Sequence, residues 1–531
     1  MTPEVADIVR RHRSAWAEGR PFVIGVLGDF SRRSRDELPP LADRHFRDVR
    51  LDTLDALMAA LAPVARIDVD DHLSGAGRLE LEIGFGSLRD FDPDALLARV
   101  PRLADAVAGL VALERGPARA AAEHRLCAQL RAVLGSEPVR ELEACWRALH
   151  GLLRALPELP ALHVRVLDVS RAELLRSMKR YRGAAWDMSP FSQWVLRDEL
   201  GTSGGRAFNL LLADYAFSYA DEDIRFLADL ARIADAASCV LIAAASPRLL
   251  GLGHHGAAGE LRAPRRLFEA AAYAGWRDLR ADADAGALAL VLPRVLARPL
   301  HRVTLAAAGG APFSEDGTDV STLPWASAVY AVGARLFTDF VLRGGYGGLP
   351  DAPTGGVIEA GGACGARGNG LEGHFTPDVA DELDDLGLIV VRQQAGSRHL
   401  HYTAARSLAR GPADFLGWRL HAGHLMHGLR DLSRHLSGLV STQREYREAM
   451  LAWLEGLCAP ARPGADDPPT NRLRSASLEA SAVEHGWGDA ASPFWKTLRV
   501  VLSVEFRPLR PGRTERCVVR ANVPGEGGPV P

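Results

Sequence analysis

Three histidines form the best candidate for metal chemistry in this sequence. His421, His424 and His427 recur at intervals of three residues in a stretch with helical apolar spacing, and His435 follows them. Residues three or four apart share one face of a helix, so His421 and His424 could hold a metal ion. Only Asp431 stands nearby to complete a ligand set. We therefore expect these histidines to pack inside the protein and to bind no metal.

Two other polar clusters are weaker candidates. Asp214 and the acidic run Asp221 to Asp223 could bind a cation, but the run comes at the start of a predicted helix, where acids stabilise exposed N–H groups. His254 and His255 lie in a glycine-flanked loop. We expect the acidic run to cap its helix and the two histidines to be solvated.

Motifs for nucleotides or nucleophilic catalysis are not found. Gly365 to Gly370 has glycines but lacks the lysine followed by Ser or Thr of a Walker phosphate loop. Gly201 to Gly205 precedes a predicted strand, which is the wrong context for dinucleotide binding. No Ser/His/Asp or Cys/His motif with a recognisable turn is present. The sequence therefore predicts no catalytic residue, no cofactor and no enzymatic activity.

The cysteines are scattered along the chain without a CxxC pair, so neither a zinc site nor a disulfide framework is predicted. Most are expected to be buried thiols. They are Cys127, Cys145, Cys239, Cys364, Cys458 and Cys517.

The elements that position these residues alternate between strands and helices, which predicts a mixed α/β protein whose sheets are covered by helices. Expected strands are residues 22–28, 79–85, 163–169, 208–215, 239–245 and 498–506. Expected helices are residues 6–17, 53–61, 170–177 and 218–237, with others running from the Asp92-Pro93 helix start to about residue 134. Glycine clusters near 309, 344–348, 355–370 and 396 predict long loops.

Composition excludes several classes of protein. The formal net charge of -3 shows no basic excess, which argues against nucleic acid as the main partner. Residues 1–20 lack the apolar core of a signal peptide, and no apolar stretch is long enough to insert into a membrane. We expect a cytoplasmic protein.

Four phrases in the first quarter of the chain are Pro21 to Phe30, Leu41 to Phe46, Phe85 to Leu96, and Val100-Pro101. In order and spacing they resemble the small subunit of the type VI secretion contractile sheath, called TssB or VipA.

A second series of phrases resembles the large sheath subunit, called TssC or VipB. It comprises Leu142 to His150, Phe208 to Ser218, Ile242 to Gly251, Leu292 to Leu296, Trp325 to Ala331, and Glu382 to Ile389. The two resemblances together span about residues 20–460 and indicate a fusion of both subunits.

The resemblance implies four regions. Residues 1–135 correspond to the small subunit, 136–458 to the core of the large subunit, 459–476 to a linker, and 477–531 to the C-terminal strand region of the large-subunit part. The junction, Val133 to Pro138, is too short for a flexible tether, so we expect the two halves to pack together.

The resemblance also implies a function. Sheath subunits are structural, assemble into a helical polymer around an inner tube of Hcp, meet a baseplate, and eject the tube by contraction. This sequence departs from the family pattern in two places that bear on the implied function. Residues 4–19 look helical where the small subunit has an extended strand that stitches neighbours together. The junction leaves almost no room for the helix that the ATPase ClpV grasps, so recycling by ClpV is not assumed.

The final expected strand is the candidate interface, because this region of the large subunit lies near the strand exchange in the resembling family. Its alternating apolar residues are Val500, Leu502, Val504 and Phe506. Two alternatives to a polymerising sheath stay open. One is a specialised cap or initiator that does not polymerise, and the other is an enzyme or ligand-binding protein that reuses the fold, with its site in Gly355 to Gly370.

Overall fold

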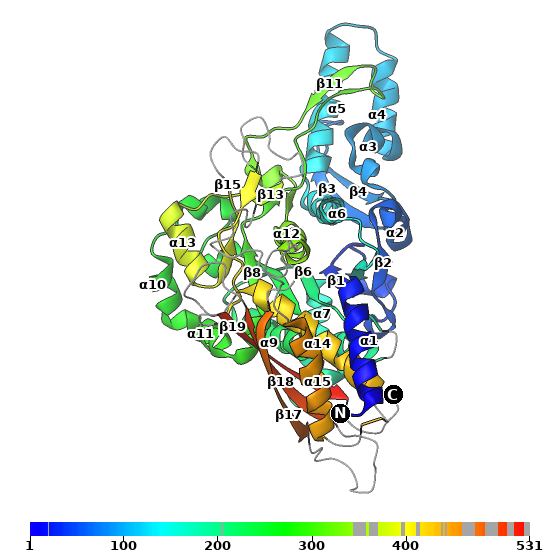
Figure 1. Ribbon diagram of the computed structural model, residues 1–531. Helices are drawn as coiled ribbons and strands as arrows, with labels where there is room; N and C mark the ends of the chain where they lie inside the picture. Colours follow the sequence, from blue (N-terminus) through cyan, green and yellow to red (C-terminus); the bar gives the residue numbers. More distant parts are fainter. Residues whose placement is uncertain are drawn as a thin grey trace, which may run out of the picture.

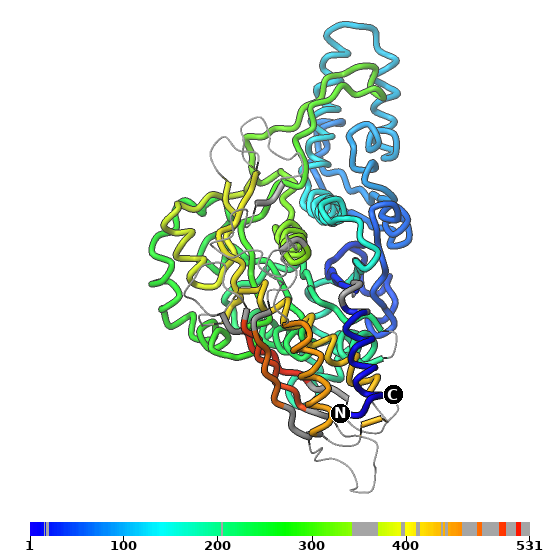
Figure 2. Tube along the Cα trace, in the orientation of Figure 1, coloured from blue at the N-terminus to red at the C-terminus, as the bar shows by residue number. Residues whose placement is uncertain are grey.

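The computed structural model describes residues 1–19, 21–202, 205–343, 357–359, 370–393, 399–409, 415–436, 439–440, 443–458, 473–483, 497–506 and 515–524. Figure 1 shows three parts: a central sheet with helices around it, a narrow extension at the top, and a small sheet with helices at the bottom. The tube in Figure 2 lets the chain be followed through all three.

The central sheet has seven strands in the order β14-β8-β7-β6-β1-β5-β2. Its neighbouring strands run parallel, except that β2 runs antiparallel to β5. Unbroken apolar runs suit strands that are covered on both faces, which is how most of these strands lie. The strands are β1 (Phe22–Gly28), β2 (Arg47–Val49), β5 (Leu162–Asp168), β6 (Leu210–Phe217), β7 (Val240–Ala245), β8 (Leu288–Leu292) and β14 (Leu388–Val390).

Strand β1 lies in the interior of this sheet, between two strands that follow much later in the sequence. Val26 is level with Val166 of β5 on one side and with Leu212 of β6 on the other. A Cβ atom at Gly25 would lie 2.8 Å from the ring of Phe208, so glycine is needed for that ring to pack on the strand. The first predicted segment therefore supplies a core strand to the second.

Helices cover both faces of the sheet. One face packs against α6 (Glu137–Ala155) and α12 (Val329–Arg343). The other face packs against α7 (Arg171–Arg180), α9 (Asp221–Ala236), α11 (Ala274–Ala281) and α13 (Pro377–Asp385), with α10 (Pro264–Glu269) beside them. The predicted mixed α/β class is confirmed.

The extension at the top of Figure 1 combines helices of the first segment with a hairpin of the second. Proline occupies the first turn of three of its helices, those that begin at Pro93, Pro101 and Pro117, a position where the missing N–H costs nothing. The elements are α2 (Leu54–Leu61), β3 (Val64–Asp70), β4 (Arg78–Gly84), α3 (Pro93–Arg99), α4 (Pro101–Val111), α5 (Pro117–Gly135), β10 (Arg302–Leu305) and β11 (Ala311–Ser314).

The lower part joins the N-terminal helix to the last strands. Strands β17 (Leu473–Val483), β18 (Thr497–Phe506) and β19 (Glu515–Pro524) form an antiparallel sheet with β18 in the centre. One face of this sheet packs against α14 (Leu416–Leu436) and α15 (Gln443–Leu457), and α1 (Pro3–Gly19) packs against the same two helices.

Besides 3-10 helices, the part of the chain that the structure describes has several other short elements. They are α8 (Pro190–Ser192), a π-helix (Gln193–Gly201), β9 (Val295–Leu296), β12 (Trp325–Ala326), β13 (Val357–Glu359), β15 (Arg392–Gln393) and β16 (His399–His401).

Two expectations about irregular segments need comment. The expected linker 459–476 ends too late, because residues 473–476 already belong to β17 through pairing with β18. Residues 459–472, the glycine clusters at 344–348 and 396, and most of 355–370 lie outside the described residues. Among the helices that the structure describes, none is both long and apolar enough to cross a membrane.

Candidate functional site: the seam between the two segments

The helix that follows the junction anchors the first segment. Helix α5 ends at Gly135 and α6 begins at Glu137, so Ser136 alone separates them. On α6, the fully buried Trp146 donates its indole N–H to the carbonyl of Phe30 at 2.9 Å. The two rings also meet edge to face at 5.3 Å, an arrangement that aromatic pairs favour. This contact fixes the end of β1 on the second segment.

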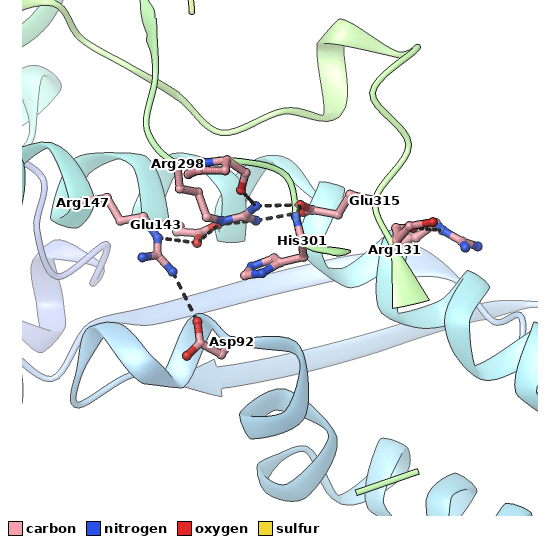
Figure 3. Close-up of polar contacts among 9 residues, drawn as sticks. Asp92, Arg131, Glu143, Arg147, Arg298, His301 and Glu315 are labelled. Carbon is pink, nitrogen blue, oxygen red and sulfur yellow. Dashed lines mark hydrogen bonds and ion pairs between the residues drawn. The ribbon is translucent and has the colours of Figure 1, made fainter. Parts of the chain in front are cut away.

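Glu143 lies on the same buried face of α6 and is fully inaccessible to solvent. Arg298 places a forked guanidinium against it, with Nε 2.6 Å and Nη2 3.1 Å from the two carboxylate oxygens. The same guanidinium reaches both oxygens of Glu315, at 2.6 and 2.8 Å. Figure 3 shows one arginine held between two carboxylates, one on α6 and one just after β11.

Arg147 extends this arrangement to the first segment. Its Nε donates to Glu143 at 2.7 Å, and its Nη2 lies 3.5 Å from a carboxylate oxygen of Asp92 (Figure 3). Helix α3 begins after Asp92 as predicted, but the Asp92 side chain makes no capping bond and faces Arg147 instead. We call Asp92, Glu143, Arg147, Arg298 and Glu315 the seam network.

The charges in the seam network depend on one another. Burial by itself raises the pKa of Glu143, but the charges of Arg298 and Arg147 outweigh burial and hold that pKa below its ordinary value. The carboxylates of Glu143 and Glu315 raise the pKa of Arg298, although burial by itself would lower it. A buried ion pair is costly to break, since the partner left behind keeps an uncompensated charge. The seam network therefore holds the elements that carry its residues in one fixed arrangement.

The hairpin β10–β11 grips the extension from the second segment. Arg131 of α5 donates to the carbonyl of Ser314 at 2.8 Å, and the backbone N–H of Ala307 donates to Asp94 at 3.1 Å. Since Glu315 directly follows β11, the hairpin is tied to the seam network at its base. The extension is thus held by both segments.

A second group of polar contacts joins the two segments at the end of β5. Asp168, at the end of β5, accepts the backbone N–H groups of Phe30 at 2.8 Å and Ser31 at 3.0 Å. Arg44 forms a forked pair with Glu173 at 2.9 and 2.8 Å. Both side chains of this pair are almost fully buried. These bonds hold the loop after β1 against α7.

The expected interface residues lie inside the chain's own fold. Val500, Leu502 and Val504 are fully buried beneath α14 and α15. Their strand β18 is paired on both edges, by β17 and by β19. The side chain of Phe506 lies outside the described residues. Their role between subunits stays a prediction.

The histidines and acids considered above are placed as follows. His427 is buried and its Nε2 is 2.9 Å from the carbonyl of Ala237, while the His424 ring lies 4.6 Å from the Trp16 ring in a tilted arrangement. Among the described residues, no group of three or more His, Cys, Asp or Glu side chains is arranged to hold a metal. His255 is buried, so the expectation of a solvated pair is wrong for it and holds only for the exposed His254.

The acids separate into two places. Asp221 to Asp223 lie in the first turn of α9, where the N-cap position makes no side-chain capping bond; Asp223 instead accepts the backbone N–H of Ser218, before the helix, at 2.7 Å. Asp214, on β6, is half-buried and accepts a hydrogen bond from Tyr330 at 3.0 Å.

Sequence analysis missed the seam network, although one signal of it is local. The apolar stripe of α6 contains Val139, Leu142, Trp146 and Leu149, and Glu143 interrupts it. A charged residue at a core position needs a buried partner of opposite charge. The identity of that partner, Arg298, has no local signal because it comes from far along the chain.

Comparisons with known proteins agree with this architecture. Residues 16–142 match the family model for the type VI secretion system protein VipA (VC_A0107 or Hcp2). Residues 119–409 match the model for the EvpB/VC_A0108 tail sheath N-terminal domain, VipB. Both models include residues 119–142, which contain most of α5 and the start of α6.

Two sheath proteins of Pseudomonas aeruginosa are similar to this chain. The chain is 31% identical to type VI secretion system sheath protein TssC1 over 242 residues, which is 45% of this chain and 49% of TssC1. It is 36% identical to sheath protein TssB1 over 83 residues, which is 16% of this chain and 48% of TssB1. The chain thus spans about half the length of each relative it matches.

A solved structure also aligns with the chain. It is the cryo-EM structure of the anti-feeding prophage (AFP) baseplate, with 13% identity and a TM-score of 0.34 over 71% of this chain and 76% of that chain. The VipB model alone covers more than half of the chain, and the VipA model precedes and overlaps it. The chain therefore belongs to the tail sheath family of type VI secretion systems, which is structural and non-enzymatic, and it carries the small-subunit and large-subunit domains in one polypeptide.

Proposed function

We propose that this chain is a building unit of a cytoplasmic contractile sheath. Copies of it assemble around an Hcp inner tube on a baseplate and eject the tube by contraction. The observation that carries the proposal is the position of β1, which lies inside a sheet built by the second segment. Each chain thereby pairs a small sheath part with a large one, divided at residues 135 and 136, and the closing strand region begins with β17.

The seam supports this proposal mechanically. Contraction requires interfaces between units to repack while each unit keeps its shape. The buried pair of Glu143 and Arg298 fixes α6 within the second segment, because breaking the pair would leave a charge unpaired in the interior. Trp146 of α6 donates to the carbonyl of Phe30 and so joins this fixed helix to the first segment. Movement is then confined to contacts between chains.

Stitching between units is proposed at the outer edges of the lower sheet. Strand β18 and its residues Val500, Leu502 and Val504 are enclosed within one chain. The free edges of this described sheet belong to β17 and β19, and an edge strand can accept a strand from another chain through backbone hydrogen bonds. In this arrangement β18 lies between the two edge strands and holds them in place through its backbone hydrogen bonds.

A second candidate, a cap or initiator that does not polymerise, is favoured by α1. Residues 3–19 form a helix on α14 and α15 of the same chain, where the resembling small subunit has an extended stitching strand. With one stitching strand replaced by a docked helix, a unit would offer its neighbours fewer links. ClpV is not included as a partner in either candidate.

Negative-stain imaging of the purified full-length chain tests both candidates. The chain is imaged alone, with the Hcp protein, and with Hcp and baseplate components. Tubes of regular width support the sheath, and discrete rings or single layers that bind the end of an Hcp tube support the cap. A chain that stays monomeric in all three mixtures and co-purifies with a stoichiometric ligand would overturn both.

A further inference from the structure

A pocket of about 350 Å³ opens between α10, α11 and the turn that joins α13 to β14, far from the seam network. These helices lie together at the left of Figure 1. The pocket lining contains four arginines, Arg265, Arg277, Arg280 and Arg406, against the two carboxylates of Glu269 and Asp385. The lining therefore has an excess of two formal positive charges.

Two of the arginines have no carboxylate partner among the described residues. Arg277 uses Nη1 to donate to the carbonyls of Phe268 and Ala270, both at 2.8 Å, which leaves its Nε and Nη2 available. Arg406 is half-buried and lies over the ring of Phe415 at 4.9 Å. In contrast, Arg265 is paired with Asp385 at 2.6 Å.

Two buried features make this more than a group of surface charges. Trp276 is 1% exposed, and its indole N–H has no hydrogen-bond partner in the structure. A buried N–H without a partner costs free energy unless a ligand or water satisfies it. Arg280, which is 7% exposed, donates Nε to the carbonyl of Leu408 at 2.9 Å, so its guanidinium is held in place.

Gly387 keeps the wall of the pocket open beside Arg280. It has a φ of +83°, and a Cβ there would lie 2.7 Å from the carbonyl oxygen of Ser407 and 3.4 Å from Nη2 of Arg280. Any side chain at this position would strain the turn and crowd the guanidinium. The turn is thus shaped to bring backbone close to the arginines without covering them.

We propose that this pocket binds a phosphate group, either as free phosphate or as a phosphate monoester. Planar guanidinium groups match phosphate oxygens with paired N–H bonds, and the indole N–H adds a neutral donor. A phosphate monoester carries about -1.5 to -2 charge at pH 7, which balances the positive excess of the lining. The site is independent of the sheath role proposed above.

Isothermal titration of the full-length chain tests the site. Sodium phosphate, phosphoserine as a monoester, and succinate as a dicarboxylate are titrated separately at constant ionic strength. We expect saturable binding at one site per chain for phosphate, phosphoserine or both. Equal affinity for both would identify the ion as sufficient, whereas binding of phosphoserine alone would show that the pocket also contacts the attached group.

Three variants locate the binding. Arg277→Gln and Arg406→Gln should each weaken it about tenfold or more, because each loses a charged donor. Trp276→Phe removes the indole N–H while keeping an aromatic ring, and should weaken binding by a smaller factor. The control, Arg447→Gln, changes an exposed arginine of α15 and should bind like the unaltered chain.

Thermal midpoints establish that each variant is folded, so a loss of binding can be assigned to the pocket. Absence of saturable heat for both phosphate compounds would overturn the proposal. So would equal affinity in Arg406→Gln, Trp276→Phe and the control. Succinate binding as tightly as phosphate would overturn the assignment to phosphate.

Discussion

Glu143 and Arg298 are separated by 155 positions in the sequence, yet Nε of Arg298 lies 2.6 Å from a carboxylate oxygen of Glu143 in a place that solvent does not reach. Glu143 belongs to the helix that follows the junction, and Arg298 precedes the hairpin that grips the extension. Their pairing therefore links the helix after the junction to the base of the hairpin β10–β11.

Glu143→Gln should destabilise the chain strongly. The substitution keeps the shape of the side chain but leaves Arg298 and Arg147 facing a neutral group in the interior. Breaking a buried pair costs about 3–5 kcal/mol, and the lower end is expected because Glu315 remains with Arg298. Denaturant unfolding monitored by tryptophan fluorescence measures the loss.

A surface pair provides the control for that measurement. Arg78→Gln breaks exposed contacts with Asp68 and Asp70, and solvent screening should make its cost far smaller than that of Glu143→Gln. Equal losses for the two variants would mean that the seam network contributes no more than a surface ion pair.

Stability should fall in mild acid because of His255. Burial lowers the pKa of His255 to about 4, compared with an ordinary value of 6.5. Between these values the unfolded chain binds a proton that the folded chain does not, so stability is lost as pH falls from 6.5 and the loss levels off below pH 4. The shift corresponds to about 3 kcal/mol.

His255→Gln should remove that part of the pH dependence. Unfolding free energies at pH values from 4 to 7 would give a shallower slope for the variant than for the unaltered chain. Glu143 also contributes less stability as pH falls, but at a lower pH than His255. Its pKa is depressed, so its contribution is lost only as pH falls below the ordinary carboxyl range. Identical slopes above pH 5 would contradict the role given to His255.

Val504→Pro should lower the thermal midpoint of the chain. Val504 is fully buried in β18 and pairs with Ala476 on one side and Cys517 on the other. Proline removes a ladder hydrogen bond from this central strand, where it is not tolerated. Differential scanning fluorimetry measures the midpoint. An unchanged midpoint combined with lost assembly would instead mean that β18 pairs with a neighbouring chain.

Gly428→Ala should release α1 without unfolding the rest. A Cβ at Gly428 would lie 2.5 Å from the ring of Trp453 and 2.6 Å from the ring of Trp16. Limited trypsin digestion should then cleave at Arg10 to Arg13 faster. If the docked helix limits polymerisation, the variant should also form longer assemblies in negative stain.

Gly151→Ala is the matched control for the release of α1. Apart from its chain neighbours and the nearby backbone of its own helix, no atom lies within 4 Å of the position of its Cβ, and Gly151 is inside α6, toward its C-terminal end. Alanine there should stabilise the helix by about 0.5–1 kcal/mol and leave the trypsin pattern unchanged. Faster cleavage in both variants would show that the packing at Trp16 is not the cause.

Separating the two segments should make both aggregate. Expressed alone, residues 1–135 would expose β1 and residues 136–531 would expose the gap between β5 and β6, and large apolar patches promote association. Co-expression should restore a soluble complex on size-exclusion chromatography. Two soluble monomeric halves that fail to bind one another would refute the proposed unit.

Local patterns predicted the elements well because burial in this sheet is continuous. The apolar runs at Phe22 to Gly28 and Val240 to Ala245 need no partner to be recognised as strands, and Pro93 marks its own helix start. Local patterns do not show which strands lie next to one another in the sheet. The insertion of β1 between β5 and β6 depends on contacts between distant residues; the short junction and the family resemblance indicated that the two segments pack together, but not how.

Side-chain environments were harder to predict for the same reason. Nothing beside His255 in the sequence indicates that its loop is covered, and the hydrogen bond that Asp214 accepts comes from Tyr330, which is far along the chain on α12. The pocket proposed to bind phosphate also escaped notice, because its arginines come from α10, from α11 and from the segment before α14 and are not clustered in the sequence.

The single residue between α5 and α6 has a consequence for how a cell would supply this protein. Because Ser136 is the whole connection, both sheath parts are made in one round of translation, always in equal numbers. Separate subunits must find each other at their cellular concentrations, whereas a covalent link makes that encounter intramolecular and insensitive to dilution. Changes in expression level would then alter how many units exist but never leave an unmatched half.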